Sequence, residues 1–254
     1  MLLNIDHKID ENFTCNNKIL QLLMSDKAFN SMNEEQVKEP ENVIRFLTES
    51  MSDLCDKNKS KDELEVLEKI DFIDDTNIEI SQLWSSLLEM IANFSKWLTY
   101  FAKGCPGFHV FDNDDLSILV ASSASFLFCI RYRKLAKVND QSFLILANNR
   151  NILLSREKSL FFSAENIISI SFLFYKILNE LELTECELAL LYPVVLLGCD
   201  ANLVKDKEYL IDLRSYYVKS LLNQFRINNR DEHFSRKLNN VSYTCDIFIL
   251  LQLN

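Results

Sequence analysis

The chain has 254 residues, and 48% of them are hydrophobic, so it can bury the core of one large domain. It has only three glycines and three prolines. Tight turns and phosphate-binding loops depend on glycine, so strand-rich folds and the usual nucleotide-binding loops are disfavoured and helices are favoured. The net charge of −10 opposes contact with a phosphate backbone, so we expect no nucleic-acid binding by this segment.

The seven cysteines are scattered and never form a C-x-x-C pair, which argues against a zinc module and a disulfide framework. Such cysteine usage indicates a reducing compartment, the cytosol or the nucleus. The apolar run Ser122–Ile130 is shorter than the ~20 residues of a membrane-spanning helix, and basic residues follow it at once. We therefore expect no membrane partner.

The first part of the chain is polar. Residues 1–40 predict a tail or hinge with one short apolar cluster, Ile19–Met24. Apolar residues at helical spacing predict a helix over Glu41–Asp56, and a charged linker leads to a short helical patch at Leu64–Ile70.

Two long helices are predicted next. Apolar residues at steps of three and four positions predict a helix from Asn77 to Ala102. The glycines and the proline that follow predict its end. The acidic run Asp112–Asp115 is typical of a helix N-cap. The helix that it starts is apolar nearly all round over Leu116–Ile130, which predicts a central position between two outer helical layers.

The second half contains one candidate hairpin, in which Ser142–Leu146 pairs with Ile152–Leu154. Thr184 and Glu187 form a capping-box pattern. Further helices are predicted over Ala164–Leu181, Thr184–Cys199, Glu208–Asn228 and His233–Leu253. The fold class is therefore all-α with one small β-hairpin.

Groups for catalysis or metal binding are sparse. The three histidines, His7, His109 and His233, lie far apart, and neither a serine nucleophile elbow nor a zinc-binding histidine pair occurs. Asp112–Asp115 lacks the spacing of a calcium loop. We therefore expect a protein that is not an enzyme.

One segment resembles a known family. Residues 101–108 read F-A-K-G-C-P-G-F and are followed by Asp114-Asp115-Leu116, which is similar to the nuclear receptor signature between the third and fourth helices. Leu183–Leu190 resembles the start of that family's eighth helix. The resemblance covers about residues 41–245 and is strongest to the retinoid-related orphan and hormone-receptor-three group, with the haem-binding Rev-erb group as runner-up.

The resemblance implies a three-layer antiparallel helical sandwich over residues 41–254, truncated before the activation helix, because the chain ends within what would be the penultimate helix. The two-zinc DNA-binding module is missing as well. We expect either an excised domain or a naturally reduced protein. Val120–Ser122 also departs from the family, which commonly has a lysine there.

The family encloses a small lipophilic ligand in its lower half. By position, the lining would be Trp84, Leu87, Met90, Ile91, Phe94, Phe128, Arg131, Leu144 and Ile145. Ordinary core packing is the alternative for each of them. Phe94 lies where related receptors often have a small residue, so its ring would fill part of the pocket.

The resemblance also implies a groove for amphipathic L-x-x-L-L helices of coregulators. Lys103 would hold the C-terminal carbonyls of such a helix, and Thr99, Ser117 and Val120 would form the floor. The alternative for Lys103 is an ordinary lysine at a helix end. Ile19–Leu23 itself has the shape I-x-x-L-L and is a weaker candidate to occupy such a groove.

We expect no cofactor. The haem receptors use a histidine in the penultimate helix and a cysteine near the third, whereas Ile247–Leu253 has no histidine and Leu87–Ile91 has no cysteine. The implied function is a ligand-binding and coregulator-docking domain of a nuclear transcription regulator, which could form a homo- or heterodimer. The alternative is an interaction-only helical module with a filled pocket, and a third possibility is an unrelated helical scaffold.

Overall fold

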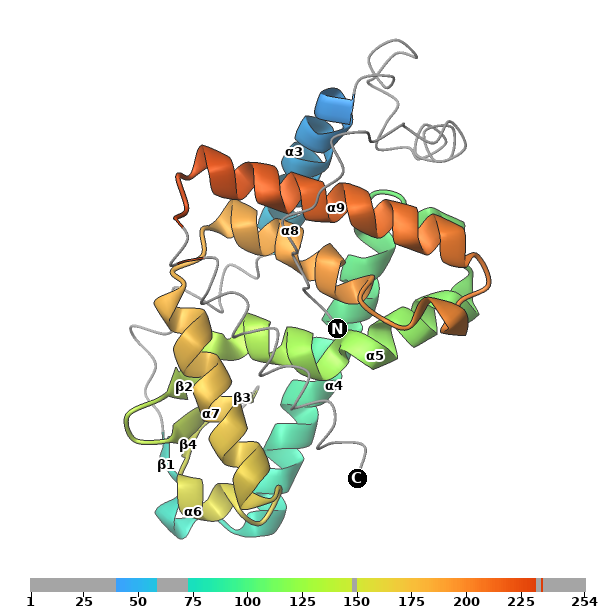
Figure 1. Cartoon of the computed structure of the whole chain (residues 1–254). Helices are drawn as coiled ribbons and strands as arrows, with labels where there is room; N and C mark the ends of the chain where they lie inside the picture. Colours follow the sequence, from blue (N-terminus) through green and yellow to red (C-terminus); the bar gives the residue numbers. More distant parts are fainter. Residues whose placement is uncertain (1–39, 59–72, 148–149, 232–233, 235–254) are drawn as a thin grey trace.

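The computed structural model of the chain describes residues 40–58, 73–147, 150–231 and 234 (Figure 1). The predicted tail, the helical patch Leu64–Ile70 and almost all of the predicted helix His233–Leu253 lie outside the described residues. The helices are α3 (Pro40–Asn58), α4 (Ile80–Gly104), α5 (Asn113–Tyr132), α6 (Arg156–Ser159), α7 (Glu165–Glu180), α8 (Glu185–Leu196) and α9 (Lys207–Ile227). Short 3-10 turns are η3 (Asp75–Asn77), η4 (Phe108–Val110), η5 (Arg133–Leu135) and η6 (Ala201–Leu203).

Helix α4 begins at Ile80, three residues later than its pattern predicts. The residues before it are hydrogen-bonded to Ser155 and Lys158. The carboxylate of Asp75 accepts 2.8 Å hydrogen bonds from the backbone N–H and the hydroxyl of Ser155. The ammonium group of Lys158 donates to the carbonyl oxygen of Ile78 at 2.9 Å. These bonds hold η3 against the start of α6, so the chain turns into α4 only after Ile78.

Helix α5 starts as its sequence predicts. The side chain of Asp112 accepts hydrogen bonds of 3.0 Å from the backbone N–H groups of Asp114 and Asp115, which caps the helix. The helix is not enclosed on every side, however. Its small residues Ser117, Ala121 and Ser125 form an exposed stripe at four-residue spacing, while the large apolar side chains face inward.

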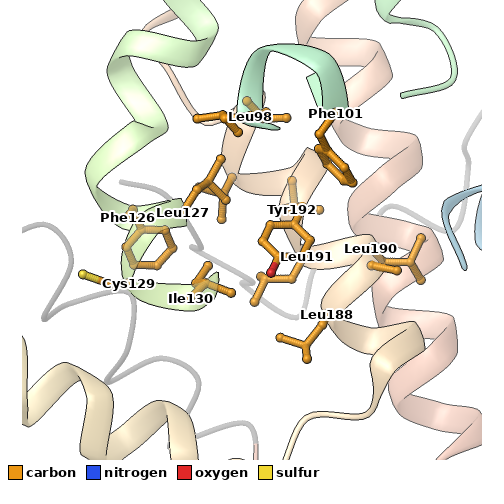
Figure 2. Packing of buried hydrophobic residues seen from close by; sticks show 14 of the residues in the cluster. Leu98, Phe101, Phe126, Leu127, Cys129, Ile130, Leu188, Leu190, Leu191 and Tyr192 are labelled. Carbon is orange, nitrogen blue, oxygen red and sulfur yellow. The ribbon is translucent and has the colours of Figure 1, made fainter. Parts of the chain in front are cut away.

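The core lies between α5 and α8. Helix α5 contacts α4, α7 and α8, and α8 also contacts α3 and α9, so α5 and α8 form an inner layer with helices on both sides. Figure 2 shows Leu127 and Ile130 of α5 facing Leu191 and Tyr192 of α8. The segment Asn113–Leu135 has the length and composition of a membrane-spanning helix, a criterion that core helices also meet, and its packing here is that of a core helix.

The sheet is larger than the predicted hairpin. Strands β3 (Ser142–Ala147) and β4 (Arg150–Leu154) form that hairpin, with Ile145 opposite Ile152. Strand β2 (Ala136–Lys137) pairs antiparallel with β3, and β1 (Ile73–Asp74) pairs parallel with β4, which gives the order β1-β4-β3-β2. The prediction of a helical domain with a small hairpin is confirmed, and two strands of two residues each extend the hairpin.

The buried carboxylate of Glu187 connects the start of α8 to the chain that follows α9. Glu187 is fully buried in the first turn of α8, where its carboxylate accepts a 2.8 Å hydrogen bond from the backbone N–H of Thr184 and completes the predicted capping box. After α9 ends, Asn228 and Arg230 both donate to the same carboxylate, at 2.9 and 2.7 Å. This contact fixes the chain that leaves α9 to the α7–α8 turn.

Candidate functional site

The predicted pocket region is occupied by aromatic side chains. Phe94 is 2% exposed, and its ring centroid lies 5.2 Å from that of Phe128 in an edge-to-face arrangement. The rings of Trp97 and Tyr132 lie 5.8 and 5.9 Å from Phe94. Aromatic pairs at such distances attract one another beyond the burial of their area. Phe94 is therefore a packed part of the core where α4 meets α5.

The other predicted pocket residues divide into two groups. Met90, Leu144 and Ile145 are buried, and Leu87 and Phe128 are partly buried against the same core. Trp84 and Ile91 are instead exposed, at 45% and 39%, on another side of α4. The structure thus places Phe128 beside Phe94 and the other buried residues in the same core, but it leaves Trp84 and Ile91 exposed.

Arg131 forms the polar edge of this aromatic cluster. Its guanidinium carbon lies 3.9 Å from the ring centroid of Trp97, a cation–π contact. The indole Nε1 of Trp97 is buried and has no hydrogen-bond acceptor among the described residues. Because a buried donor without a partner costs on the order of 1–3 kcal/mol, this N–H marks a place where an acceptor would be stabilising.

Sequence reasoning missed Trp97 and Tyr192 as members of the cluster. The Trp97 ring stacks on Phe101 at 5.0 Å and meets the edge of Tyr192 at 5.6 Å. Burial raises the pKa of Tyr192 to about 12, although Arg131 and Arg133 oppose the shift, so its hydroxyl is neutral near pH 7. The only signal in the sequence was the apolar pattern of α8, which does not reveal its partner in α4.

Two cysteines are buried in the core. Burial raises the pKa of the thiol of Cys129 to about 11 and that of Cys105 well above its usual value, so both are protonated and weakly nucleophilic near pH 7. Among the residues that the structure describes, no three His, Cys, Asp or Glu side chains gather as a metal site.

The second predicted site lies at the other end of α4. Lys103 is exposed in the last turn of that helix. Thr99 is exposed too, and its hydroxyl donates to the carbonyl oxygen of Ser95 in its own helix at 2.9 Å. On α5, Ser117 is exposed and donates to the carbonyl oxygen of Asn113 at 2.7 Å, while Val120 is partly buried against the core.

The loop between these helices is fixed by two tyrosines of α9. The hydroxyl of Tyr217 donates to the carbonyl oxygen of Pro106 at 2.7 Å, and that of Tyr209 donates to the carbonyl oxygen of Gly107 at 2.6 Å. Gly107 has φ of 84°, a left-handed conformation that favours glycine. A Cβ on Gly104 would lie 2.8 Å from a methyl carbon of Leu54, so α3 and the end of α4 approach closely there.

The start of α5 carries a salt-bridge network with the α8–α9 loop. The ammonium group of Lys205 contacts the carboxylates of Asp112 and Asp114, and its backbone N–H donates to Asp115 at 3.2 Å. The hydrogen bond from the backbone N–H of Asp115 and the contact with Lys205 lower the pKa of Asp112. Both ends of the loop after Lys103 are therefore held in place. We use the name α4–α5 surface for the end of α4 at Thr99 and Lys103 together with the start of α5 at Ser117 and Val120.

Comparisons with known proteins bear on the family of this chain. No family model matches the sequence. The chain is similar to the nuclear receptor ROR-alpha B of Danio rerio, with 27% identity over 157 residues, which is 61% of this chain. The aligned region covers 32% of that receptor, so the chain spans about a third of its length. This similarity, together with the layered helical fold, relates the chain to the nuclear receptors.

Proposed function

We propose that this chain is a non-enzymatic regulatory domain of the nuclear receptor type, acts in the nucleus, and binds amphipathic L-x-x-L-L helices of coregulator proteins at the α4–α5 surface. The observation that carries the proposal is the position of Lys103, exposed at the C-terminal end of α4 beside a loop that α9 holds in place. The similarity to a nuclear receptor supports the class of partner.

The chemistry of this surface suits the end of a helix. The last carbonyl groups of a docked helix lack partners and carry partial negative charge, which a lysine ammonium group stabilises. The exposed stripe of Ser117, Ala121 and Ser125 on α5 has small side chains, so a helical backbone can approach it closely. Val120 supplies apolar contact at its edge.

The test is binding of a fluorescent L-x-x-L-L peptide to the full chain. Lys103→Ala should weaken binding roughly tenfold, because a charge-assisted contact contributes on the order of 1–2 kcal/mol. Lys176→Ala removes an exposed lysine of α7 and is the matched control, which should bind as the unmodified chain does. Equal affinities of the two variants would contradict the proposal.

A second candidate function is binding of a small ligand beside Phe94. The buried Nε1 of Trp97 favours it, since a ligand with an acceptor group would complete that donor while the neighbouring rings supply apolar contacts. Arg131, stacked on the same indole, would orient a polar or anionic end. Because the Phe94 ring fills the middle of the cluster, the ligand would be small.

Native mass spectrometry of the full chain distinguishes the two candidates. A co-purifying small molecule that is lost in Trp97→Phe would support ligand binding. An unliganded protein that still binds the peptide would leave an interaction-only module. We further propose that no haem is bound, because α4 has no cysteine from Leu87 to Ile91; a Soret band in the purified protein would overturn this.

A further inference from the structure

Helix α3 and the end of α4 meet closely, and each carries a cysteine near the meeting point. Cys105 is the C-cap residue of α4, and Cys55 lies in the last turn of α3, which ends at Asn58. A Cβ on Gly104, the residue before Cys105, would lie 2.8 Å from a methyl carbon of Leu54, the residue before Cys55. The two segments therefore touch one residue before each cysteine.

A second contact ties the same two segments together. The hydroxyl of Tyr217 lies 3.8 Å from the sulfur of Met51 and donates to the carbonyl oxygen of Pro106 at 2.7 Å. Met51 lies four residues before Cys55, one turn earlier on the same face of α3, and Pro106 directly follows Cys105. The residues on both sides of Cys105 are therefore tied to α3 within about one turn of Cys55.

The two thiols also influence each other electrostatically. Burial raises the pKa of Cys105, and the charge that Cys55 carries as a thiolate raises it further, an effect that weakens with distance. Cys105 is 2% exposed, whereas Cys55 is partly exposed. An oxidant in solution therefore reaches Cys55 first, and Cys105 is shielded from it.

We propose that Cys55 and Cys105 form a redox-sensitive site, at which hydrogen peroxide converts two thiols to a disulfide between α3 and the end of α4. The thiolate of Cys55 attacks one oxygen of the peroxide and the O–O bond breaks. The products are a sulfenic acid at Cys55 and hydroxide, which takes up the proton that the Cys55 thiol lost and becomes water.

In the second step the sulfur of Cys105 attacks the sulfur of Cys55 and the S–O bond breaks. The proton of the Cys105 thiol leaves with the hydroxyl group as a second water molecule. Two thiols and one peroxide thus give one disulfide and two water molecules, and the electron pair lost by the sulfur atoms reduces the peroxide.

The second step needs a local movement that both positions allow. The thiol of Cys105 donates to the carbonyl oxygen of Phe101 at 3.4 Å, a weak hydrogen bond that is lost when the sulfur turns toward Cys55. Both cysteines lie at helix ends, where the backbone adjusts at lower cost than inside a helix. Because burial keeps Cys105 protonated near pH 7, its attack relies on its closeness to Cys55, which acts as a high effective concentration.

A third cysteine lies near enough to compete for the link. The sulfur of Cys186, in the first turn of α8, lies 3.8 Å from the hydroxyl oxygen of Ser52 on α3. Ser52 precedes Cys55 by three residues, whereas the residue next to Cys55 touches the residue next to Cys105. We therefore assign the link to Cys105, and the test separates the two pairings.

Disulfide mapping of the full chain tests the proposal. The protein is treated with a few equivalents of hydrogen peroxide, its remaining thiols are blocked, and it is digested with trypsin and chymotrypsin. Phe108 and Phe111 lie between Cys105 and Cys129, so chymotrypsin separates these two cysteines. We expect a linked peptide that contains Cys55 and Cys105 and that dithiothreitol separates. Oxidation should also raise the melting temperature by roughly 5–10 °C, because the link restrains a long loop in the unfolded chain.

Two substitutions and a matched control identify the cysteines involved. Cys55→Ala and Cys105→Ala should each abolish the linked peptide and the rise in melting temperature. Cys199→Ala removes another partly exposed cysteine and should leave the response to peroxide as it is in the unmodified chain.

A peptide that links Cys55 to Cys186 would overturn the inference, as would a chain in which other thiols are oxidised while Cys55 and Cys105 stay unlinked. A rise in melting temperature that persists in Cys105→Ala would contradict it as well. Neither measurement uses the L-x-x-L-L peptide, so the outcome is independent of the function proposed for Lys103.

Discussion

The hydroxyl of Tyr217 donates a 2.7 Å hydrogen bond to the carbonyl oxygen of Pro106, across 111 positions of the sequence. Tyr217 is fully buried on α9, and Pro106 lies three residues after Lys103. The outer helix α9 thereby sets the backbone that carries the candidate peptide-binding lysine. We therefore expect the stability of α9 and the proposed peptide binding at Lys103 to be coupled through this contact.

Tyr217→Phe should lower both quantities. The substitution leaves the buried carbonyl oxygen of Pro106 without this donor, which costs about 1–2 kcal/mol of unfolding free energy. The loop after Lys103 loses one of its two tyrosine anchors, so the peptide affinity should fall as well. Thermal unfolding and fluorescence anisotropy measure the two effects. Tyr100→Phe, at a tyrosine that is 68% exposed, is the control and should leave both unchanged.

Glu187→Gln should be among the most destabilising single changes on α8. The glutamate is fully buried, and Arg230 and Asn228 both donate to it. Replacing one partner of a buried ion pair leaves the other charge poorly compensated, and we expect a loss of roughly 3 kcal/mol. Urea unfolding measures it. Glu185→Gln, two residues earlier and exposed, should cost far less; a similar loss there would contradict the assignment.

The same carboxylate should make stability depend on acid. Burial raises the pKa of Glu187, but the hydrogen bonds from Arg230, Asn228 and the backbone of Thr184 together outweigh it, so the pKa in the folded protein is lowered. A lowered folded pKa gives stability that is complete above the unfolded pKa of about 4.3 and is lost as the pH falls through the folded value.

The difference in unfolding free energy between the unmodified chain and Glu187→Gln should therefore be constant between about pH 6 and 7 and shrink below about pH 4. Urea unfolding at a series of pH values measures this difference. A gap that stays constant or widens on acidification would show that Glu187 is not held ionised in the folded protein.

Phe94→Ala should open the aromatic cluster. Truncation of a buried phenylalanine costs about 3–5 kcal/mol and leaves an apolar cavity. Small apolar molecules of the size of benzene should then raise the melting temperature of the variant but not that of the unmodified chain. Tyr100→Ala removes an exposed ring of the same helix and should show no such rescue. A variant that no small apolar molecule stabilises would indicate that the cluster collapses around the missing ring.

Helix positions were predictable from sequence because spacing and caps are local properties. The steps in α4, the Asp112 cap of α5 and the Thr184 capping box all depend on residues within a few positions of one another. Strands β1 and β2 have two residues each, and α6 has four, so none of them is long enough to show a period.

The candidate site was only partly predictable, for reasons that also lie in geometry. The apolar surface of α4 covers more than one side of the helix, and spacing does not say which row faces the core, so Trp84 and Ile91 were expected beside Phe94 and lie exposed. The partners of Trp97 in α5 and α8 lie far away in the sequence. The end of α4 was predictable within two residues from the glycines and the proline there, whereas Lys103 was singled out only by the family resemblance.

The parallel pairing of Ile73 with Ile152 predicts the order in which the strands of the sheet form during folding. The loop that this pair closes contains α4, α5, β2 and β3, and its partner strand β4 belongs to the hairpin, so β1 can add to the sheet only after the hairpin exists. A two-residue strand at the edge of a sheet also detaches at the lowest cost. The amide protons of β1 should gain protection after those of the β3–β4 hairpin during refolding, and in the folded protein they should exchange with heavy water before those of the hairpin.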